Sequence, residues 1–226
     1  MHAVAREALA SGEVLTPEGE RLPLHSHLPR LECEVLQDWV VERRPRRLLE
    51  IGCAYGISTL FVCEALARTG GAEVYHVVDP WQGSEWRGVG IHALERAGYR
   101  HLVELHEVPS ELFLPRLLAG GSKLDFALVD GWHGYDQVMM EVYYLNRLLD
   151  VGGLLVLDDV QLPAVRRVLD FLGTLPAYRP VPAPAARRAE LAARVRRMMG
   201  TAEHRIAAVE KVAEDERSAD FWVDFP

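Results

Sequence analysis

The chain has 226 residues, of which 49% are hydrophobic and 26% are charged, a composition typical of a globular protein with one substantial core. Its formal net charge of -8 argues against a general nucleic-acid binder, because such proteins need a basic face to neutralise phosphates. No apolar run approaches the roughly 18 residues that span a bilayer, and the N-terminus lacks a signal segment. We therefore expect a cytoplasmic protein that binds a small molecule and contacts neither nucleic acid nor membrane.

The cysteines Cys33, Cys53 and Cys63 lack CxxC spacing and lie in segments with the pattern of helix or strand interiors. This arrangement favours neither a disulfide framework nor a zinc site. It is typical of a protein in a reducing compartment.

Secondary structure is weakly indicated before residue 29 and strongly afterwards. Residues 1–28 mix proline, glycine, histidine and charge, and we expect an N-terminal arm or lid there, followed by one domain over 29–226. Helical spacing starts at Leu31 and stops at Pro45. Strand-like runs follow at 48–51, 74–78, 102–105, 124–129 and 154–157, and helix-like stretches at 57–68, 87–98, 110–119, 135–149 and 162–173. This alternation predicts an α/β fold with a parallel sheet and helices on both faces.

The last part of the chain has a different pattern. Strand-like runs at 178–181 and 205–212 flank two prolines and an Arg-rich amphipathic stretch at 185–199. We predict a closing pair of strands around a helical insertion at about 183–200. The insertion is expected to form a substrate lid or a subunit interface, so a homodimer is left open, and to be dispensable for cofactor binding.

The strongest local signal is the stretch from Leu48 to Ser58, an apolar strand that ends in Glu50 and enters a glycine turn before a helix. Gly52 and Gly56 allow the backbone to approach a ligand closely, and the next helix offers unpaired amides at its N-terminus. A dinucleotide-binding loop favours GxGxxG, whereas this loop has GxxxG. The pattern predicts a ligand-binding turn, although single glycines are often only turn residues.

The second predicted strand ends in Asp79, where a carboxylate is well placed to accept hydrogen bonds from both hydroxyls of a ribose. This position predicts a nucleoside ligand. The alternative is an aspartate that caps the turn before Pro80. Trp81 follows, either stacked on a base or covering the sheet.

Polar side chains also follow the third, fourth and fifth predicted strands. They are Ser110, Glu111, Asp130, Trp132, His133, Asp158 and Asp159. Because parallel strands all end at the same edge of a sheet, we expect these side chains to converge there.

With these motifs, the chain resembles class I S-adenosylmethionine-dependent methyltransferases over roughly residues 30–182, and within them the catechol O-methyltransferase-like group with its bacterial sugar and antibiotic O-methyltransferase relatives. The resemblance implies a Rossmann-like, seven-stranded, mostly parallel sheet and methyl transfer to a hydroxyl of a small-molecule acceptor. It places the methionine part of the cofactor on the Glu-x-Gly loop, the ribose on Asp79 and the adenine beside Ser110. The implied cofactor-binding residues are Glu50, Gly52, Tyr55, Gly56, Ser58, Asp79, Trp81, Ser110, Glu111, Asp130 and Trp132.

The resemblance also implies a magnesium ion on Asp130, Asp158 and Asp159, with His133 as the catalytic base where catechol-type enzymes carry a lysine. Carboxylates alone make a hard oxygen-donor site of the kind that magnesium prefers. The alternatives are that Asp158 and Asp159 only cap the next helix, and that His133 is a packing residue. The rival function is a nucleotide-binding protein that is an NAD-type oxidoreductase or a regulator.

Overall fold

The structure is a computed structural model that describes residues 1–185, 187, 205–218 and 220–222. Most of the insertion predicted at about 183–200 lies outside the described residues, so its role as lid or interface stays a prediction.

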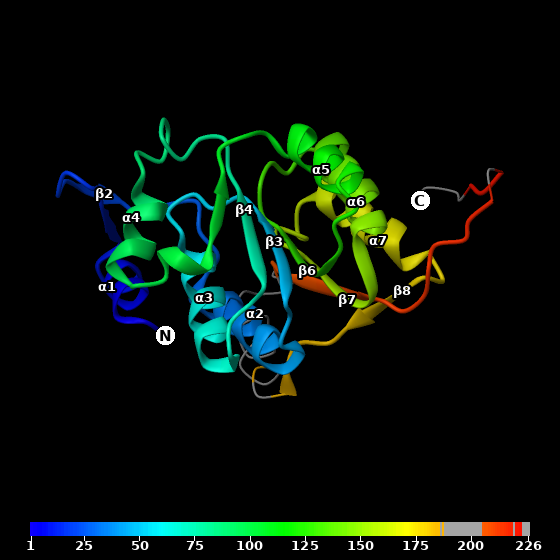
Figure 1. The fold of residues 1–226 in the computed structure, drawn as a ribbon, viewed down its shortest axis with the longest axis horizontal. Helices are drawn as coiled ribbons and strands as arrows, with labels where there is room; N and C mark the ends of the chain where they lie inside the picture. The colour runs from blue at the N-terminus through cyan, green and yellow to red at the C-terminus, as the bar shows by residue number, and fades with distance from the viewer. Residues whose placement is uncertain (186, 188–204, 219, 223–226) are drawn as a thin grey trace.

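A seven-stranded sheet with the order β5-β4-β3-β6-β7-β9-β8 forms the centre of the molecule (Figure 1). Its strands are β3 (Arg47–Ile51), β4 (Val74–Val78), β5 (Glu104–His106), β6 (Leu124–Val129), β7 (Leu149–Leu157), β8 (Tyr178–Val181) and β9 (Ala207–Lys211). All neighbouring pairs from β5 to β7 are parallel, whereas β9 runs antiparallel between β7 and β8. The predicted Rossmann-like, mostly parallel sheet with its closing strand pair is confirmed.

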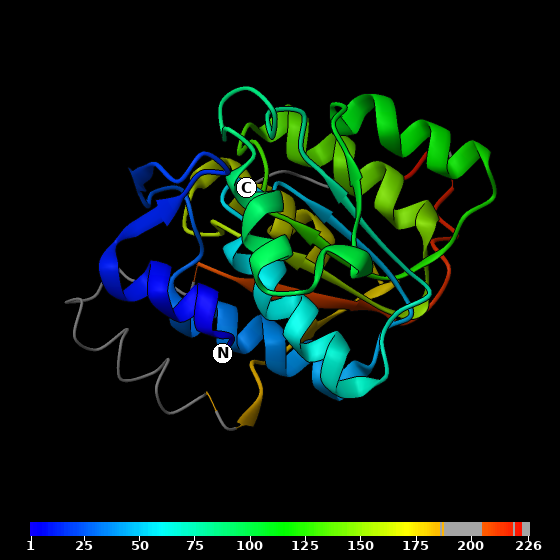
Figure 2. The same ribbon diagram turned by 60° about the vertical axis from the view of Figure 1, so that its left-hand side comes forward.

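Helices cover both faces of this sheet (Figures 1 and 2). One face carries α2 (Arg30–Arg43), α3 (Ile57–Thr69) and α4 (Val89–Arg96), and the other carries α5 (Ser110–Ala119), α6 (Tyr135–Leu148) and α7 (Pro163–Gly173). Successive side chains of β3 point to opposite faces, so that Leu48 packs with the α2 and α3 residues and Leu49 with the α6 residues. Apolar strands that are buried on both faces are typical of such a sheet.

The N-terminal arm has more regular structure than its composition indicates. It contains α1 (Ala3–Ser11) and a hairpin of β1 (Glu13–Leu15) and β2 (Arg21–Pro23). Val4, Ala5, Ala8 and Val14 are buried in the same core as α2 and α3. The arm therefore packs against the domain, and its role as a lid stays a prediction.

Four strands, β3, β5, β7 and β9, have boundaries that differ from the predicted ranges. The run expected at 102–105 begins with a short 3₁₀ turn (Arg100–Leu102), and β5 occupies only 104–106. Strand β7 starts at Leu149 instead of 154, because Gly152, with a φ of 93°, lies inside it and hides the strand from a hydrophobicity pattern.

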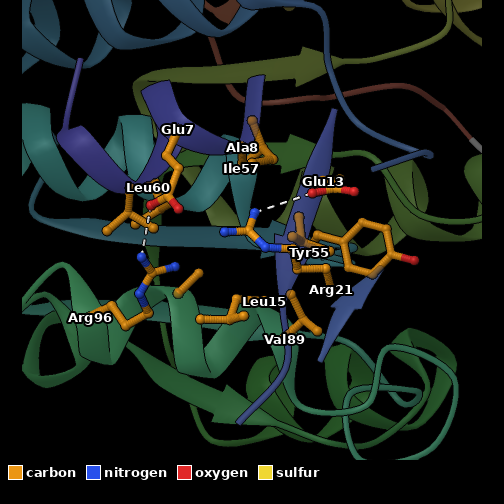
Figure 3. Close-up of a pocket in the computed structure, with 13 residues that line it drawn as sticks. Glu7, Ala8, Glu13, Leu15, Arg21, Tyr55, Ile57, Leu60, Val89 and Arg96 are labelled. Carbon is orange, nitrogen blue, oxygen red and sulfur yellow. Dashed lines mark hydrogen bonds and ion pairs between the residues drawn. The ribbon is translucent and has the colours of Figure 1, made fainter. Parts of the chain in front are cut away.

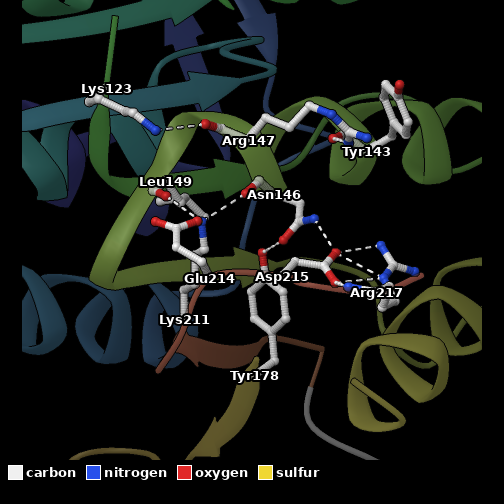
Figure 4. Close-up of polar contacts among 10 residues, drawn as sticks. All are labelled: Lys123, Tyr143, Asn146, Arg147, Leu149, Tyr178, Lys211, Glu214, Asp215 and Arg217. Carbon is white, nitrogen blue, oxygen red and sulfur yellow. Dashed lines mark hydrogen bonds and ion pairs between the residues drawn. The ribbon is translucent and has the colours of Figure 1, made fainter. Parts of the chain in front are cut away.

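The inserted strand β9 is fixed at its end by Lys211, a fully buried lysine (Figure 4). Its Nζ donates to the backbone oxygens of Asn146 (3.0 Å) and Leu149 (2.9 Å) and pairs with Glu214 at 2.7 Å. A buried charge is tolerated only with such partners. Lys211 therefore ties the end of β9 to the end of α6 and to the start of β7.

Candidate active site

The ends of β3, β4, β6 and β7 meet at what we call the carboxyl edge of the sheet. The loop after β3 contacts the loop after β6 so closely that a Cβ on Gly52 would lie 2.1 Å from the backbone oxygen of Asp130. Gly52 also has a φ of 91°, which side chains disfavour. At the other end of the loop, Gly56 precedes α3, and no described side chain caps that helix. The amides of its first turn are suited to an anionic ligand group.

Glu50 points away from this loop, into the core beneath α3. It is fully buried and accepts hydrogen bonds from Ser58 Oγ (2.5 Å), Thr59 Oγ1 (3.1 Å) and the hydroxyl of Tyr75. Burial raises the pKa of Glu50 to about 7, against the lowering effect of these hydrogen bonds. Glu50 and Ser58 thus join β3 to α3, and a direct contact of either side chain with a cofactor stays a prediction.

The raised pKa of Glu50 predicts a pH-dependent stability. In the folded state the pKa is about 7 against an ordinary 4.5, so the folded chain binds more protons than the unfolded chain between these values. Stability should therefore fall as pH rises from about 4.5 to about 7, and Glu50→Gln should flatten this decline by at most on the order of 3 kcal/mol. Urea unfolding at pH 5 and pH 8 measures it. Glu85→Gln, at an exposed acid, is the control and should leave the decline as in wild type. An unchanged slope in Glu50→Gln would contradict the assignment.

Asp79 holds the glycine loop from the end of β4. Its Oδ2 accepts from the amides of Cys53 (3.0 Å) and Ala54 (2.8 Å) and from Nε2 of Gln82 (3.1 Å). Its Oδ1 accepts a hydrogen bond from the amide of Trp81 at 2.9 Å. This contact is the turn cap that the sequence offered as the alternative role of Asp79. Asp79 therefore orders the loop whatever its ligand. Its Oδ1, which accepts one hydrogen bond within the described residues, can also accept one from a ribose hydroxyl.

A polar cluster at the start of α5 contains a buried acid that the sequence analysis missed. Ser110 Oγ donates to Glu141 Oε1 at 2.6 Å, and Gln137 Nε2 donates to Ser110 Oγ at 2.8 Å and lies 3.4 Å from Glu111 Oε2. Glu141 lies on the apolar face of α6, and burial raises its pKa to about 7. The sequence does contain a signal for this buried acid, because Glu141 lies at helical spacing from the apolar residues Val138 and Leu145.

Aromatic side chains surround the glycine loop. Tyr55 is buried, its hydroxyl lies 2.8 Å from Nε2 of His25, and its ring packs edge-on against Trp86 at 5.2 Å. Tyr55 also lines a small cavity beneath α1 and the hairpin (Figure 3). That cavity, of about 20 Å³, has room for little more than a water molecule, so it is no acceptor pocket as it stands. Trp81 and Trp132 are exposed, by 53% and 74%, and leave large apolar surface at the carboxyl edge.

The carboxylates predicted to bind magnesium divide into a pair and a single residue. Asp130 and Asp158 interact directly, and burial together with the Asp158 charge raises the pKa of Asp130 well above its usual range. Oδ1 of Asp158 is buried and makes no hydrogen bond within the described residues.

Asp159 faces other partners. Its Oδ2 lies 3.1 Å from Nε2 of His133, and its Oδ1 accepts from Nε of Arg205 (2.8 Å) and from Gln161 (2.7 Å). Asp159 has a φ of 54°, a conformation that is uncommon outside glycine, asparagine and aspartate. Arg205 also reaches Oδ2 of Asp158 at 3.4 Å. Sequence reasoning missed this arginine, which is 46 residues distant from Asp159.

The chemistry of Asp130 and Asp158 fits a divalent cation, whereas Asp159 in this arrangement does not. Two interacting buried carboxyl groups, of which one oxygen has no partner within the described residues, are what a hard cation would satisfy. Asp159 already balances Arg205, and within the described residues the three acids do not bring their oxygens close enough together to count as one metal-ligating group. The three-carboxylate magnesium site stays a prediction, and the geometry favours two of its members.

Residues 49–160, from β3 to just beyond β7, match a family model described as a methyltransferase domain. The chain carries a methyltransferase domain. It is 27% identical over 157 residues to the rat protein described as a transmembrane O-methyltransferase homolog, covering 68% of this chain and 59% of the rat protein. Within the described residues no helix is both long and apolar enough to cross a membrane.

Solved structures share the fold of this methyltransferase domain. The O-methyltransferase TomG from Streptomyces achromogenes, in complex with S-adenosylmethionine (SAM), superposes with a TM-score of 0.62 at 20% identity and covers 83% of this chain and 82% of its own. The O-methyltransferase from Bacillus cereus, in complex with S-adenosylhomocysteine (SAH), gives 0.67 at 17% identity, with 93% and 92% covered. The predicted class I methyltransferase fold is confirmed, and the family match agrees with the predicted methyltransferase domain.

Proposed function

We propose that this chain transfers the methyl group of S-adenosylmethionine to a hydroxyl oxygen of a small-molecule acceptor, with a divalent cation at Asp130 and Asp158. The observation that carries the proposal is the position of the His133–Asp159 pair, 3.1 Å apart, beside the Asp130–Asp158 pair at the same edge as the glycine loop. The relatives named as O-methyltransferases support the reaction class.

Each part of the carboxyl edge has a task in this proposal. Bound SAM supplies an electrophilic methyl group, for which the loop ordered by Asp79 and the first turn of α3 form the binding surface. A magnesium ion on Asp130 and Asp158 would supply a Lewis acid that makes a bound hydroxyl more acidic.

His133 removes the proton of the acceptor. Asp159 holds its Nε2, which leaves Nδ1, without a hydrogen bond in the described part of the chain, to accept the proton. Bound SAM would supply the methyl group to this oxygen and would leave as SAH. Arg205 neutralises Asp159 and keeps that carboxylate turned toward His133. Asp159 and Arg205 are thus positioning residues, and His133 is the catalytic base.

Calorimetry with SAH tests the cofactor assignment. We expect the chain to bind SAH with micromolar-scale affinity and not to bind NAD. This result would contradict the rival oxidoreductase function. Asp79→Ala should weaken SAH binding by about 1 to 3 kcal/mol, because the variant loses a charged acceptor and the loop loses its anchor. Glu85→Gln, an exposed acid on the same loop, is the control. Unchanged SAH affinity in Asp79→Ala would remove Asp79 from the binding site, and NAD binding in place of SAH would overturn the proposed function.

A further inference from the structure

A group of metal-binding side chains lies on the outer strands of the sheet, away from the methyl-transfer residues. His76 comes from the middle of β4, and Glu104 and His106 from the neighbouring edge strand β5. In the parallel register His76 pairs with Glu104 and Val78 with His106, which places all three side chains on the face covered by α5. The function proposed above uses none of them.

We propose that His76, Glu104 and His106 bind a transition-metal ion of the zinc class. Nδ1 of His76 lies 3.0 Å from Nε2 of His106 and 3.3 Å from Oε2 of Glu104, and the three ligand atoms all lie within 4.8 Å of one another. Tetrahedral zinc with bonds of about 2.0–2.1 Å separates its ligand atoms by about 3.3–3.4 Å. The two distances from His76 Nδ1 are thus within a few tenths of an ångström of this spacing.

The surroundings favour a soft-to-borderline metal over magnesium. Two imidazole nitrogens and one carboxylate are ligands typical of zinc, whereas magnesium selects oxygen donors. Burial lowers the pKa of both His76 and His106, which keeps the rings in the neutral form that coordinates metal. The ring of Phe113 packs on His106 at 4.3 Å and on His76 at 5.6 Å, forming an apolar wall on one side.

The site is open to solvent at its fourth position. The side chain of Glu104 is 62% exposed, which provides an entry path and leaves room for a water ligand. The ion would join edge strand β5 to β4 through metal–ligand bonds. These bonds would add to the hydrogen bond from the Asp79 amide to the His106 carbonyl (3.1 Å). Its effect would be to stabilise the strand pair that supports the Asp79 turn.

Zinc calorimetry on the full chain tests the site, with excess magnesium present so that the carboxylates of the methyl-transfer site are filled. We expect one zinc ion per chain with micromolar or tighter affinity. His106→Gln should weaken binding by about 10-fold or more and Glu104→Gln by less, because one ligand of three is lost or neutralised. His92→Gln is the matched control, since His92 lies 3.9 Å from Glu95 in a His–Glu pair on α4 outside this group.

Cobalt binding supplies a readout that is independent of catalysis and of SAH. Cobalt(II) in a four-coordinate site gives an intense visible spectrum, which should appear with the wild-type chain and disappear on addition of zinc. Glu104 is exposed, so Glu104→Gln should fold even if His106→Gln does not. Absence of zinc binding below millimolar concentration, a six-coordinate cobalt spectrum, or equal weakening in His92→Gln would each overturn the proposal.

Discussion

His133→Ala should lower kcat by about 10²- to 10⁴-fold, the range that a positioned general base contributes. The ring is held by Asp159 at 3.1 Å and is about one-third exposed, so a proton that it accepts can leave to solvent. SAH affinity should stay within a few-fold of wild type, because the loss concerns proton transfer and not cofactor binding. The measurement is the single-turnover rate of methyl transfer over a pH range. The pH dependence of this rate that comes from the catalytic base should be lost in His133→Ala.

Two further variants separate catalysis from packing in this experiment. His101→Ala removes an exposed histidine and should leave kcat and the pH profile unchanged. Asp159→Asn keeps the size of the side chain but not its charge, and should lower kcat less than His133→Ala while shifting the pH profile, as expected for a residue that acts through His133. An unchanged rate and pH profile in His133→Ala would remove the base from the mechanism.

Exhaustive chelation should lower methyl transfer by at least about 100-fold, and magnesium should restore it, because a Lewis acid contributes several kcal/mol to an oxyanion-forming step. The structure separates Asp158 from Asp159 as a metal ligand, whereas the sequence treats the two residues alike. Asp158→Asn should abolish most Mn²⁺ binding, measured by electron paramagnetic resonance, since Asp158 Oδ1 is the buried oxygen without a partner. Asp159→Asn should leave most of it, because Asp159 faces His133 and Arg205.

The two aspartate variants are matched in size and charge change and are adjacent in sequence, so a difference between them reports on geometry. Equal loss of Mn²⁺ binding in both variants would restore the three-carboxylate site that the family resemblance implies. Full activity after chelation would eliminate the metal, and the positive charge at this edge would then come from Arg205, 2.5 Å from Asp159.

Sequence pattern was a good guide where a signal is local. The ranges 74–78, 110–119, 124–129 and 178–181 agree with β4, α5, β6 and β8 residue for residue. Such segments combine an apolar period with turn residues on both sides, and both signals lie within a few residues of each other. The convergence of Asp79, Asp130 and Asp158 on one edge also follows from local signals, once the strands are known to be parallel.

Side-chain direction and distant partners were harder to predict. Glu50 was predicted as a ligand contact because it precedes Gly52. The two-residue period of β3 puts it on the same face as Leu48, inside the core, and its contact with a cofactor stays a prediction. The position of Arg205 depends on β9 being inserted next to β7, a pairing between segments about 50 residues apart that no local pattern encodes. The left-handed backbone of Asp159 likewise has no sequence signature.

The insertion of β9 between β7 and β8 also bears on how the chain is assembled during synthesis. Until residues 207–211 have left the ribosome, β7 has an unpaired side and β8 has no neighbour in the sheet. Unpaired strand edges template wrong pairings, so the nascent chain passes through a stage at which it is prone to associate with other chains. The same late strand brings Arg205 to Asp159. The sheet and the carboxyl edge are therefore completed together. A chain whose synthesis stops before residues 205–211 exposes β7 and lacks Arg205 beside Asp159.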